Sequence, residues 1–197
     1  MKPKQFNKLA SEAFGNVLGE AGFENSKSRH CTFYREASEN FYHIVMPDLS
    51  TYGTWYDVKV FASSSLLDPR FSDLFPDYLG IPTNSFCYLA PSGVGLDQTP
   101  FNCTSEENFT RRFESTVAPL LTSIALPYLD RFQSLNDLLP EIRSPLYSAI
   151  ATHHVHGSAI SQPLLEQQRE RFGSFNSDDE NVVATLRLID ELLSKPA

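Results

Sequence analysis

Residues 55–62 read WYDVKVFA and alternate between apolar and mixed side chains. Because successive side chains of a β-strand point to opposite faces, this period of two predicts a strand with two unlike faces. One face is apolar and carries Tyr56, Val58, Val60 and Ala62, whereas the other carries Trp55, Asp57, Lys59 and Phe61. We expect the apolar face to pack against a core.

Three further segments have the composition of strands. Residues 32–35 and 41–46 are rich in aromatic and β-branched side chains, and the polar link 36–40 suits a hairpin between them. Pro47 cannot donate to a ladder, so the second of these strands is expected to end there. Residues 86–90 are the last candidate, which gives an antiparallel sheet of about four strands.

Helical patterns flank the predicted sheet. Apolar residues recur at three- and four-residue steps through residues 4–21, and Gly22 follows where a left-handed C-cap is expected. After residue 104 the period becomes helical again. Thr104 and Glu107 form a capping-box pattern, and Pro119 is expected to kink or split the helix that follows. Further helix starts are predicted at Ser134 (with an end at Pro140), Ser144-Pro145, Ser161-Gln162-Pro163, and Ser177 with Glu180.

Strands that are segregated from helices indicate the α+β class. The predicted order is an N-terminal helix, an antiparallel sheet of about four strands, and a helical C-terminal half. We divide the chain into an α+β domain at 1–140, with a long Pro-rich loop at 63–100, and a helical extension at 141–197 that packs on it. A loop of that length in a compact domain is either functional or contains further elements.

The composition is acidic. The 197 residues carry a formal net charge of −8 at pH 7. Phosphate backbones repel such a chain unless a local basic patch dominates, so direct nucleic-acid binding is disfavoured. The acidic charge either suits a basic partner or only aids solubility.

Three cysteines and the N-terminus bear on the compartment. Cys31, Cys87 and Cys103 are widely spaced and odd in number, which predicts reduced, buried thiols in a cytosolic protein. No signal-peptide pattern is visible at the N-terminus, and no apolar run is long enough to span a bilayer. We therefore expect a cytoplasmic protein with no membrane partner.

Three of the five histidines lie together within residues 152–157. On a helix, His153 and His156 lie on one face, where they could share a metal ion. No third ligand has a recognisable spacing nearby. The alternatives are a helix end at Gly157, where histidines bond the last carbonyls, and a pH-sensing cluster. No cofactor is expected, and nucleophile and phosphate-loop signatures are absent from the sequence.

The mixed face of the strand at 55–62 is the predicted partner-binding surface. An exposed patch of aromatic and charged side chains would be a binding surface, although helices or the Pro-rich loop could instead cover it. On this face we expect neighbours from the adjacent strand, namely Phe41, His43 and Val45. The candidate contacts are Trp55, Asp57, Lys59 and Phe61, with Asp73 and Asp77 of the loop.

Short motifs follow one another through residues 4–140. Gly22-Phe23 ends the first helix, Thr32-Phe33-Tyr34-Arg35 opens the sheet, and later segments read Tyr42–Val45, Trp55–Val58 and Leu126–Phe132. This order resembles a bacterial domain-of-unknown-function family in which a helix ending in GF leads to an FYR strand and an antiparallel meander. The resemblance implies an α+β fold and a cytoplasmic bacterial protein. Some members are similar to immunity proteins of toxin systems, and no catalytic residues are implied.

The leading hypothesis is a non-catalytic protein-binding module, in its specific form an immunity protein that neutralises a bacterial toxin by direct contact. The motivation is the acidic charge, the aromatic content of 12% and the absence of a catalytic signature. One alternative is a metal-dependent enzyme or metal-binding protein that uses His153 and His156. Another is a helical adaptor whose C-terminal helices dock a peptide in a groove.

Overall fold

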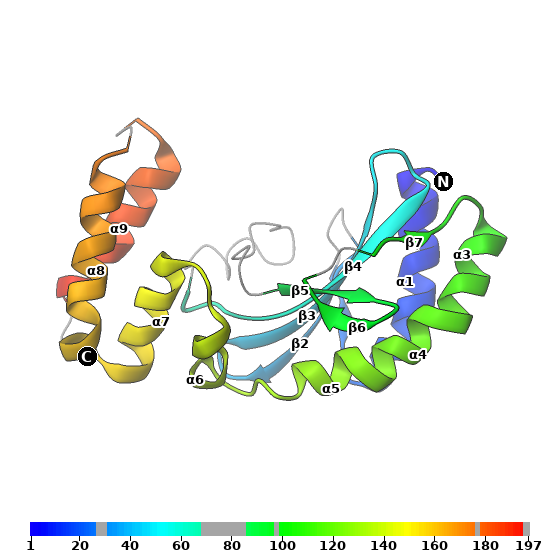
Figure 1. The fold of residues 1–197 in the computed structure, drawn as a ribbon, viewed down its shortest axis with the longest axis horizontal. Coiled ribbons are helices and arrows are strands. Elements are labelled where there is room, and N and C mark those ends of the chain that lie inside the picture. The colour runs from blue at the N-terminus through cyan, green and yellow to red at the C-terminus, as the bar shows by residue number, and fades with distance from the viewer. Residues whose placement is uncertain (27–30, 68–85, 97–98, 176–177, 195–197) are drawn as a thin grey trace.

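The computed structural model describes residues 1–26, 31–67, 86–96, 99–175 and 178–194. Figure 1 shows a central sheet with α1 and the helical segment that begins at α3 beside one end, and with α8 and α9 at the other end of the molecule. The predicted α+β class is confirmed, because an N-terminal helix precedes an antiparallel sheet and a helical C-terminal half.

The sheet built from the described residues has seven strands, not the four that were predicted. The order is β1-β2-β3-β4-β5-β6, with β7 also paired to β4, and each pairing is antiparallel. The additional strands β1, β6 and β7 have two or three residues, which is too short to display a period in the sequence. The bounds are β1 Glu24–Asn25, β2 Phe33–Ser38, β3 Phe41–Leu49, β4 Trp55–Ser64, β5 Phe86–Ala90, β6 Gly93–Gly95 and β7 Phe101–Asn102.

Strand β3 continues through Pro47 to Leu49, so the predicted end at the proline was wrong. Beyond Val45 the strand no longer pairs with β2, while its pairing with β4 continues. A proline is tolerated there because Pro47 lies beyond the last residue of β3 that pairs with β2, so no ladder hydrogen bond to β2 is lost. The β3–β4 hairpin extends past β2, and near its turn β7 pairs with Trp55 and Tyr56 of β4 (Figure 1).

Helix α1, Pro3–Glu20, agrees with the predicted helix at 4–21. Gly22 follows with a φ of +81°, and the amide of Phe23 donates to the carbonyl of Leu18 at 3.0 Å, which is the expected left-handed C-cap. The buried stripe of the helix is Phe6, Ala10, Phe14 and Leu18. These side chains pack in one core with the apolar face of β4, which contributes Tyr56, Val58 and Val60.

A second long helical segment covers the same face of the sheet. It begins with α3, Glu106–Arg112, where the Ser105 hydroxyl accepts from the amide of Asn108 at 3.1 Å. The capping box predicted at Thr104 and Glu107 is therefore wrong by one residue. The segment continues as the π-helical turn Phe113–Val117, α4 Ala118–Leu120, the π-helical turn Leu121–Ala125, and α5 Leu126–Leu129.

Pro119 changes the hydrogen bonding of this segment without ending it. The amide of Ala118 donates to the carbonyl of Phe113, five residues earlier, and the amide of Leu126 donates in the same way to Leu121 just before Pro127. Because a proline ring clashes with the carbonyl four residues before it, a wider turn ahead of each proline lets the helical path continue.

The C-terminal half contains four more helical elements in its described part. They are α6 Leu135–Leu138, which runs into a 3₁₀ turn at Leu139–Glu141, then α7 Pro145–His156, α8 Ser158–Gly173 and α9 Glu180–Ser194. Ser134 caps α6 and Pro145 opens α7, as predicted.

Two predicted helix starts need comment. The start at Ser161 was wrong, because Gly157, with a φ of +82°, separates α7 from α8 and Pro163 lies inside α8. The positive φ of Gly157 ends α7, and α8 begins directly after it at Ser158. Ser177 lies outside the described residues. At the start of α9 the carboxylate of Asp179 accepts from the amide of Asn181 at 2.8 Å.

A second hydrophobic core joins the helical half to the sheet. Phe41, Ala62 and Leu67 belong to the same buried cluster as Ile150 of α7, Leu165 of α8 and Ile189 of α9. The division into domains at residue 140 stays a prediction.

Candidate functional site

The register of β3 against β4 decides which side chains share the mixed face. Phe61 lies opposite Ile44, Lys59 opposite Met46, and Asp57 opposite Asp48. Directly paired residues of an antiparallel sheet point to the same face. The neighbours expected from the sequence, Phe41, His43 and Val45, therefore lie on the opposite face, and that prediction was wrong. A shift of one residue in register moves each side chain of a strand to the other face.

One end of the mixed face is buried. Phe61 is 1% exposed and forms a small cluster with Ile44 and Met46, against which Tyr34 and Tyr42 pack. Phe61 is thus a packed side chain of this face and is not accessible to a partner.

The other end of the mixed face is open. Trp55 is 37% exposed, and Tyr52, in the turn that joins β3 to β4, is 84% exposed. Asp48 and Asp57 lie beside them as an opposed pair. We call Asp48, Tyr52, Trp55 and Asp57 the hairpin surface. Tryptophan and tyrosine are enriched in contact hot spots, so these exposed rings mark a candidate contact surface.

The two carboxylates of the hairpin surface differ in their surroundings. The carboxylate of Asp48 forms an ion pair with the Lys59 ammonium at 2.5 Å. Asp57 forms no ion pair within 4.0 Å in the described part of the chain. Partial burial raises the pKa of Asp57 above its ordinary value, nearby Lys59 opposes the rise, and Asp48 adds to it. The negative charge of Asp48 beside Asp57 favours the approach of a positive group, which would lower the pKa of Asp57 again.

The N-terminus braces the hairpin turn. The Met1 ammonium donates to the carbonyl of Gly53 at 2.5 Å, and Gly53 has a φ of +67°. A Cβ atom at residue 53 would overlap the carbonyl oxygen of Met1. Glycine is needed at this position for both its backbone conformation and the close approach.

The histidines of α7 differ in their exposure to solvent. His153 is buried, and its Nδ1 lies 3.0 Å from the hydroxyl of the buried Ser161 across the α7–α8 turn, whereas His156 is exposed. Within the described ranges, no group of three or more His, Cys, Asp or Glu side chains is arranged to hold a metal ion. Metal binding by His153 and His156 remains a prediction without a third ligand.

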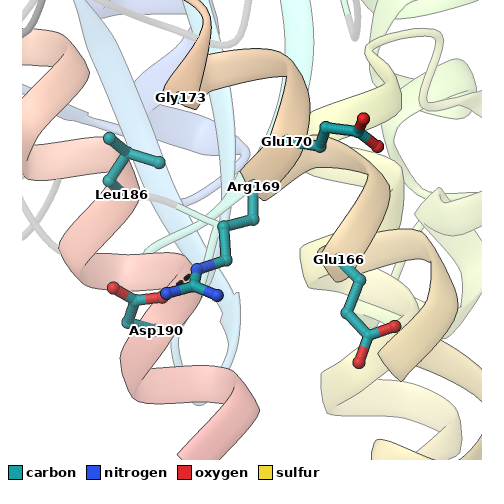
Figure 2. Close-up of a pocket in the computed structure, with 6 residues that line it drawn as sticks. All are labelled: Glu166, Arg169, Glu170, Gly173, Leu186 and Asp190. Carbon is teal, nitrogen blue, oxygen red and sulfur yellow. Dashed lines mark ion pairs between the residues drawn. The ribbon is translucent and has the colours of Figure 1, made fainter.

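A groove lies between α8 and α9. Its volume is about 440 Å³, and it is lined by Glu166, Arg169, Glu170, Gly173, Leu186 and Asp190. Figure 2 shows Arg169 reaching from α8 toward Asp190 of α9, where the two form an ion pair of 2.7 Å. The carboxylate of Glu166 accepts a hydrogen bond from the side-chain amide of Gln162 at 2.9 Å. The groove is rich in carboxylates, so it suits a basic segment.

The three cysteines carry no disulfide. Cys31 and Cys103 are buried and Cys87 is partly exposed. Burial raises the pKa of the Cys31 thiol to about 11 and that of Cys103 to about 11. Thiols of this kind are poor nucleophiles, which agrees with the expected structural role.

The contact residues predicted from the sequence differ in whether the structure leaves them accessible. Trp55 and Asp57 lie on the hairpin surface, Lys59 supports it through Asp48, and Phe61 is buried. Asp73 and Asp77 lie outside the described residues. Sequence reasoning missed Asp48 and Tyr52, although a tyrosine before a glycine in a hairpin turn is a readable signal of exposure.

The chain was compared with protein-family models, with curated proteins and with solved structures, and none of the three comparisons found a match. No described helix combines the length and the apolar character needed to cross a bilayer.

Proposed function

We propose that this chain is a protein-binding module that contacts a basic partner through the hairpin surface. The observation that carries the proposal is that Trp55, 37% exposed, lies on the same face as Asp57, which has no ion-pair partner in the described residues. Tryptophan is one of the residue types enriched among the interface side chains that contribute most to binding.

The charge of the chain supports a basic partner. A net charge of −8 attracts a positively charged protein over several ångströms and raises the rate of association at low ionic strength. At the contact itself, Asp57 would accept from a lysine or arginine, and the rings of Tyr52 and Trp55 would pack against the aliphatic part or the guanidinium of that side chain.

The specific form of the proposal is an immunity protein whose partner is a toxin with a basic contact surface. Its supports are the motif resemblance through residues 4–140 and the acidic charge. Non-catalytic action by direct contact requires only the surface described above.

The test places a photo-crosslinking amino acid, benzoylphenylalanine, at position 55 in cells of the native host. A matched position is 175, where Phe175 is 47% exposed just after α8, and α8 lies at the opposite end of the molecule from the β3–β4 turn (Figure 1). We expect a discrete adduct from position 55 and not from position 175. Adducts of equal yield at both positions, or no adduct at either, would contradict the proposal.

Charge reversal then tests the chemistry of the contact. Asp57→Lys is expected to abolish the position-55 adduct, whereas Glu191→Lys, the same charge change on the exposed side of α9, is expected to leave it intact. An adduct that survives Asp57→Lys would show that the contact does not depend on the carboxylate.

The groove between α8 and α9 favours a second function, a helical adaptor that docks a basic peptide. Its support is that Glu166, Glu170 and Leu186 line one groove, which offers charged and apolar contacts to an amphipathic segment. Truncation of the C-terminal helices is an unsuitable test, because Leu165 and Ile189 belong to a core shared with the sheet. Glu166→Lys with Glu170→Lys should instead abolish capture of the partner while Asp57→Lys does not.

A further inference from the structure

A separate pocket lies between the edge strand β7 and helix α3. Its volume is about 470 Å³, and the residues that line it, largely through the carbon atoms of their side chains, are Asn102, Asn108, Arg111, Arg112 and Ser115. Asn102 comes from β7, where it pairs with Trp55 of β4, and the others come from the helical segment. Pockets of this size accommodate small organic ligands.

The spacing on the helical segment builds this pocket. Asn108, Arg111, Arg112 and Ser115 recur at steps of three and four residues, which places them along one side of the helix. Ser115 belongs to the first π-helical turn, which begins immediately after Arg112. Turns of this type are frequent at functional sites, because they change the direction of side chains within a helix.

The two arginines are not neutralised. In the part of the chain that the structure describes, no carboxylate lies within 4.0 Å of either guanidinium. Glu107 precedes Arg111 by four residues, the spacing of a helical ion pair, yet that pair does not form. In the described part of the chain, the two adjacent guanidinium groups are therefore available to an anionic ligand.

The pocket also contains an acceptor without a donor. The Oδ1 atom of Asn108 is buried and has no hydrogen-bond partner among the described residues. A buried acceptor that lacks a donor is destabilising, and a ligand hydroxyl that reached Asn108 would satisfy it. A matching ligand would therefore carry an oxyanion that accepts from the two guanidinium groups and a hydroxyl group that donates to Asn108.

We propose that this pocket binds a small phosphate monoester that carries free hydroxyl groups. Arg111 and Arg112 bind the phosphate oxygens, the hydroxyl of Ser115 and the amide of Asn102 donate to the same group, and Asn108 accepts from a ligand hydroxyl. Nucleic acid does not suit the site, because the acidic remainder of the chain repels an extended polyanion.

The test is calorimetric titration of the full chain at constant ionic strength. The probes are glycerol phosphate, inorganic phosphate, glycerate and glycerol. Glycerol phosphate is expected to bind with the highest affinity, inorganic phosphate more weakly, and glycerol without measurable heat. If glycerate binds more tightly than glycerol phosphate, the phosphate assignment is wrong, and if no probe saturates the protein, the site is not an anion site.

Variants locate the binding. Arg111→Gln with Arg112→Gln is expected to weaken glycerol phosphate binding at least tenfold, because the variant lacks both guanidinium groups that donate charge-assisted hydrogen bonds to the phosphate. Arg143→Gln removes a charge from an exposed arginine elsewhere and is expected to change the affinity by less than about twofold.

Asn108→Ala separates the hydroxyl contact from the phosphate contact. It should weaken glycerol phosphate binding several-fold and leave inorganic phosphate binding nearly unchanged, since only the former supplies a hydroxyl group from a carbon chain. Because Arg111 and Arg112 are exposed, the variants are expected to keep the parent melting temperature without ligand. Equal loss of binding in the double arginine variant and in Arg143→Gln would overturn the proposal.

Discussion

Arg35 of β2 donates from Nε to Nδ1 of His43 on β3 at 3.1 Å, and this contact fixes the state of the imidazole ring. The other ring nitrogen, Nε2, lies 2.6 Å from the carbonyl of Phe132, which can only accept. The proton must therefore be on Nε2, and the ring is neutral. Arg35 also donates to the carbonyl of Ala21 and pairs with Asp130, so the cluster ties the end of α1 and the turn after α5 to the sheet.

The neutral His43 predicts a pH dependence of stability. Burial lowers the pKa of His43, the bond to Phe132 opposes this, and the positive charge of Arg35 lowers it further. A pKa that is lower in the folded state than its ordinary value of about 6.5 means that stability is complete above that value and is lost as pH falls through the folded pKa. We expect urea unfolding to show stability falling from pH 7 to pH 5, with a smaller fall in His43→Gln.

The exposed His156 provides the control for this measurement. His156→Gln should keep the parent slope of stability against pH, because His156 is an exposed side chain of α7 that lies outside the cluster of Arg35, His43 and Asp130. Identical slopes for the parent and His43→Gln would show that the imidazole is not the group that titrates.

Gly53 and Gly19 are predicted to respond in opposite directions to alanine. Gly53→Ala introduces a Cβ at a φ of +67° and against Met1, and should cost about 1–3 kcal/mol of unfolding free energy. Gly19 lies in α1 with open space around it, so Gly19→Ala should stabilise by up to about 1 kcal/mol. Thermal unfolding by circular dichroism measures both, and a neutral Gly53→Ala would mean that the N-terminus yields without cost.

Leu165→Ala tests whether the helical half and the sheet unfold together. Leu165 is fully buried in the core shared with Phe41 and Ala62, so its truncation should cost about 2–5 kcal/mol. Trp55, the single tryptophan, reports on the sheet, whereas far-ultraviolet dichroism reports mainly on the helices. We expect both signals to shift to the same lower urea midpoint. A shift in the dichroism alone would mark two separately unfolding units.

The cysteines should differ in their rate of alkylation. Iodoacetamide at pH 8 is expected to modify the partly exposed Cys87 first, because Cys31 and Cys103 are buried and the pKa of each is raised to about 11. Mass spectrometry of peptides after timed quenching measures the order. In about 6 M guanidinium the three rates should converge, since unfolding removes the burial. Early modification of Cys31 in the folded protein would contradict its buried position.

Long elements with clear periods were predictable from the sequence. The helix at 4–21 and the strand at 55–62 were assigned correctly, because a buried stripe or face repeats along many residues. Boundaries were less predictable. Thr104 and Ser105 are both suitable caps, and only the hydrogen bond from Asn108 to Ser105 decides between them.

The candidate surface was predictable only in part. The mixed face of β4 was predictable from the alternation of its side chains. Its neighbours depend on the register between β4 and β3, which could not be predicted from the sequence. Phe61 and Trp55 are both aromatic and lie on the same face of β4, yet Phe61 is buried and Trp55 is exposed. Burial of a residue on a strand face depends on what lies across the sheet, not on the strand itself.

The sequence by itself determined the α+β class, the amphipathic first helix, the two-faced strand and the acidic charge, because each follows from local periodicity or from composition. Tertiary structure alone decided that Asp48 opposes Asp57, that His43 is held neutral between Arg35 and Phe132, and that Arg111 and Arg112 share a pocket with Asn102. These relationships join residues distant in the chain, and their geometry follows from strand register and helix packing, which are set by the fold as a whole.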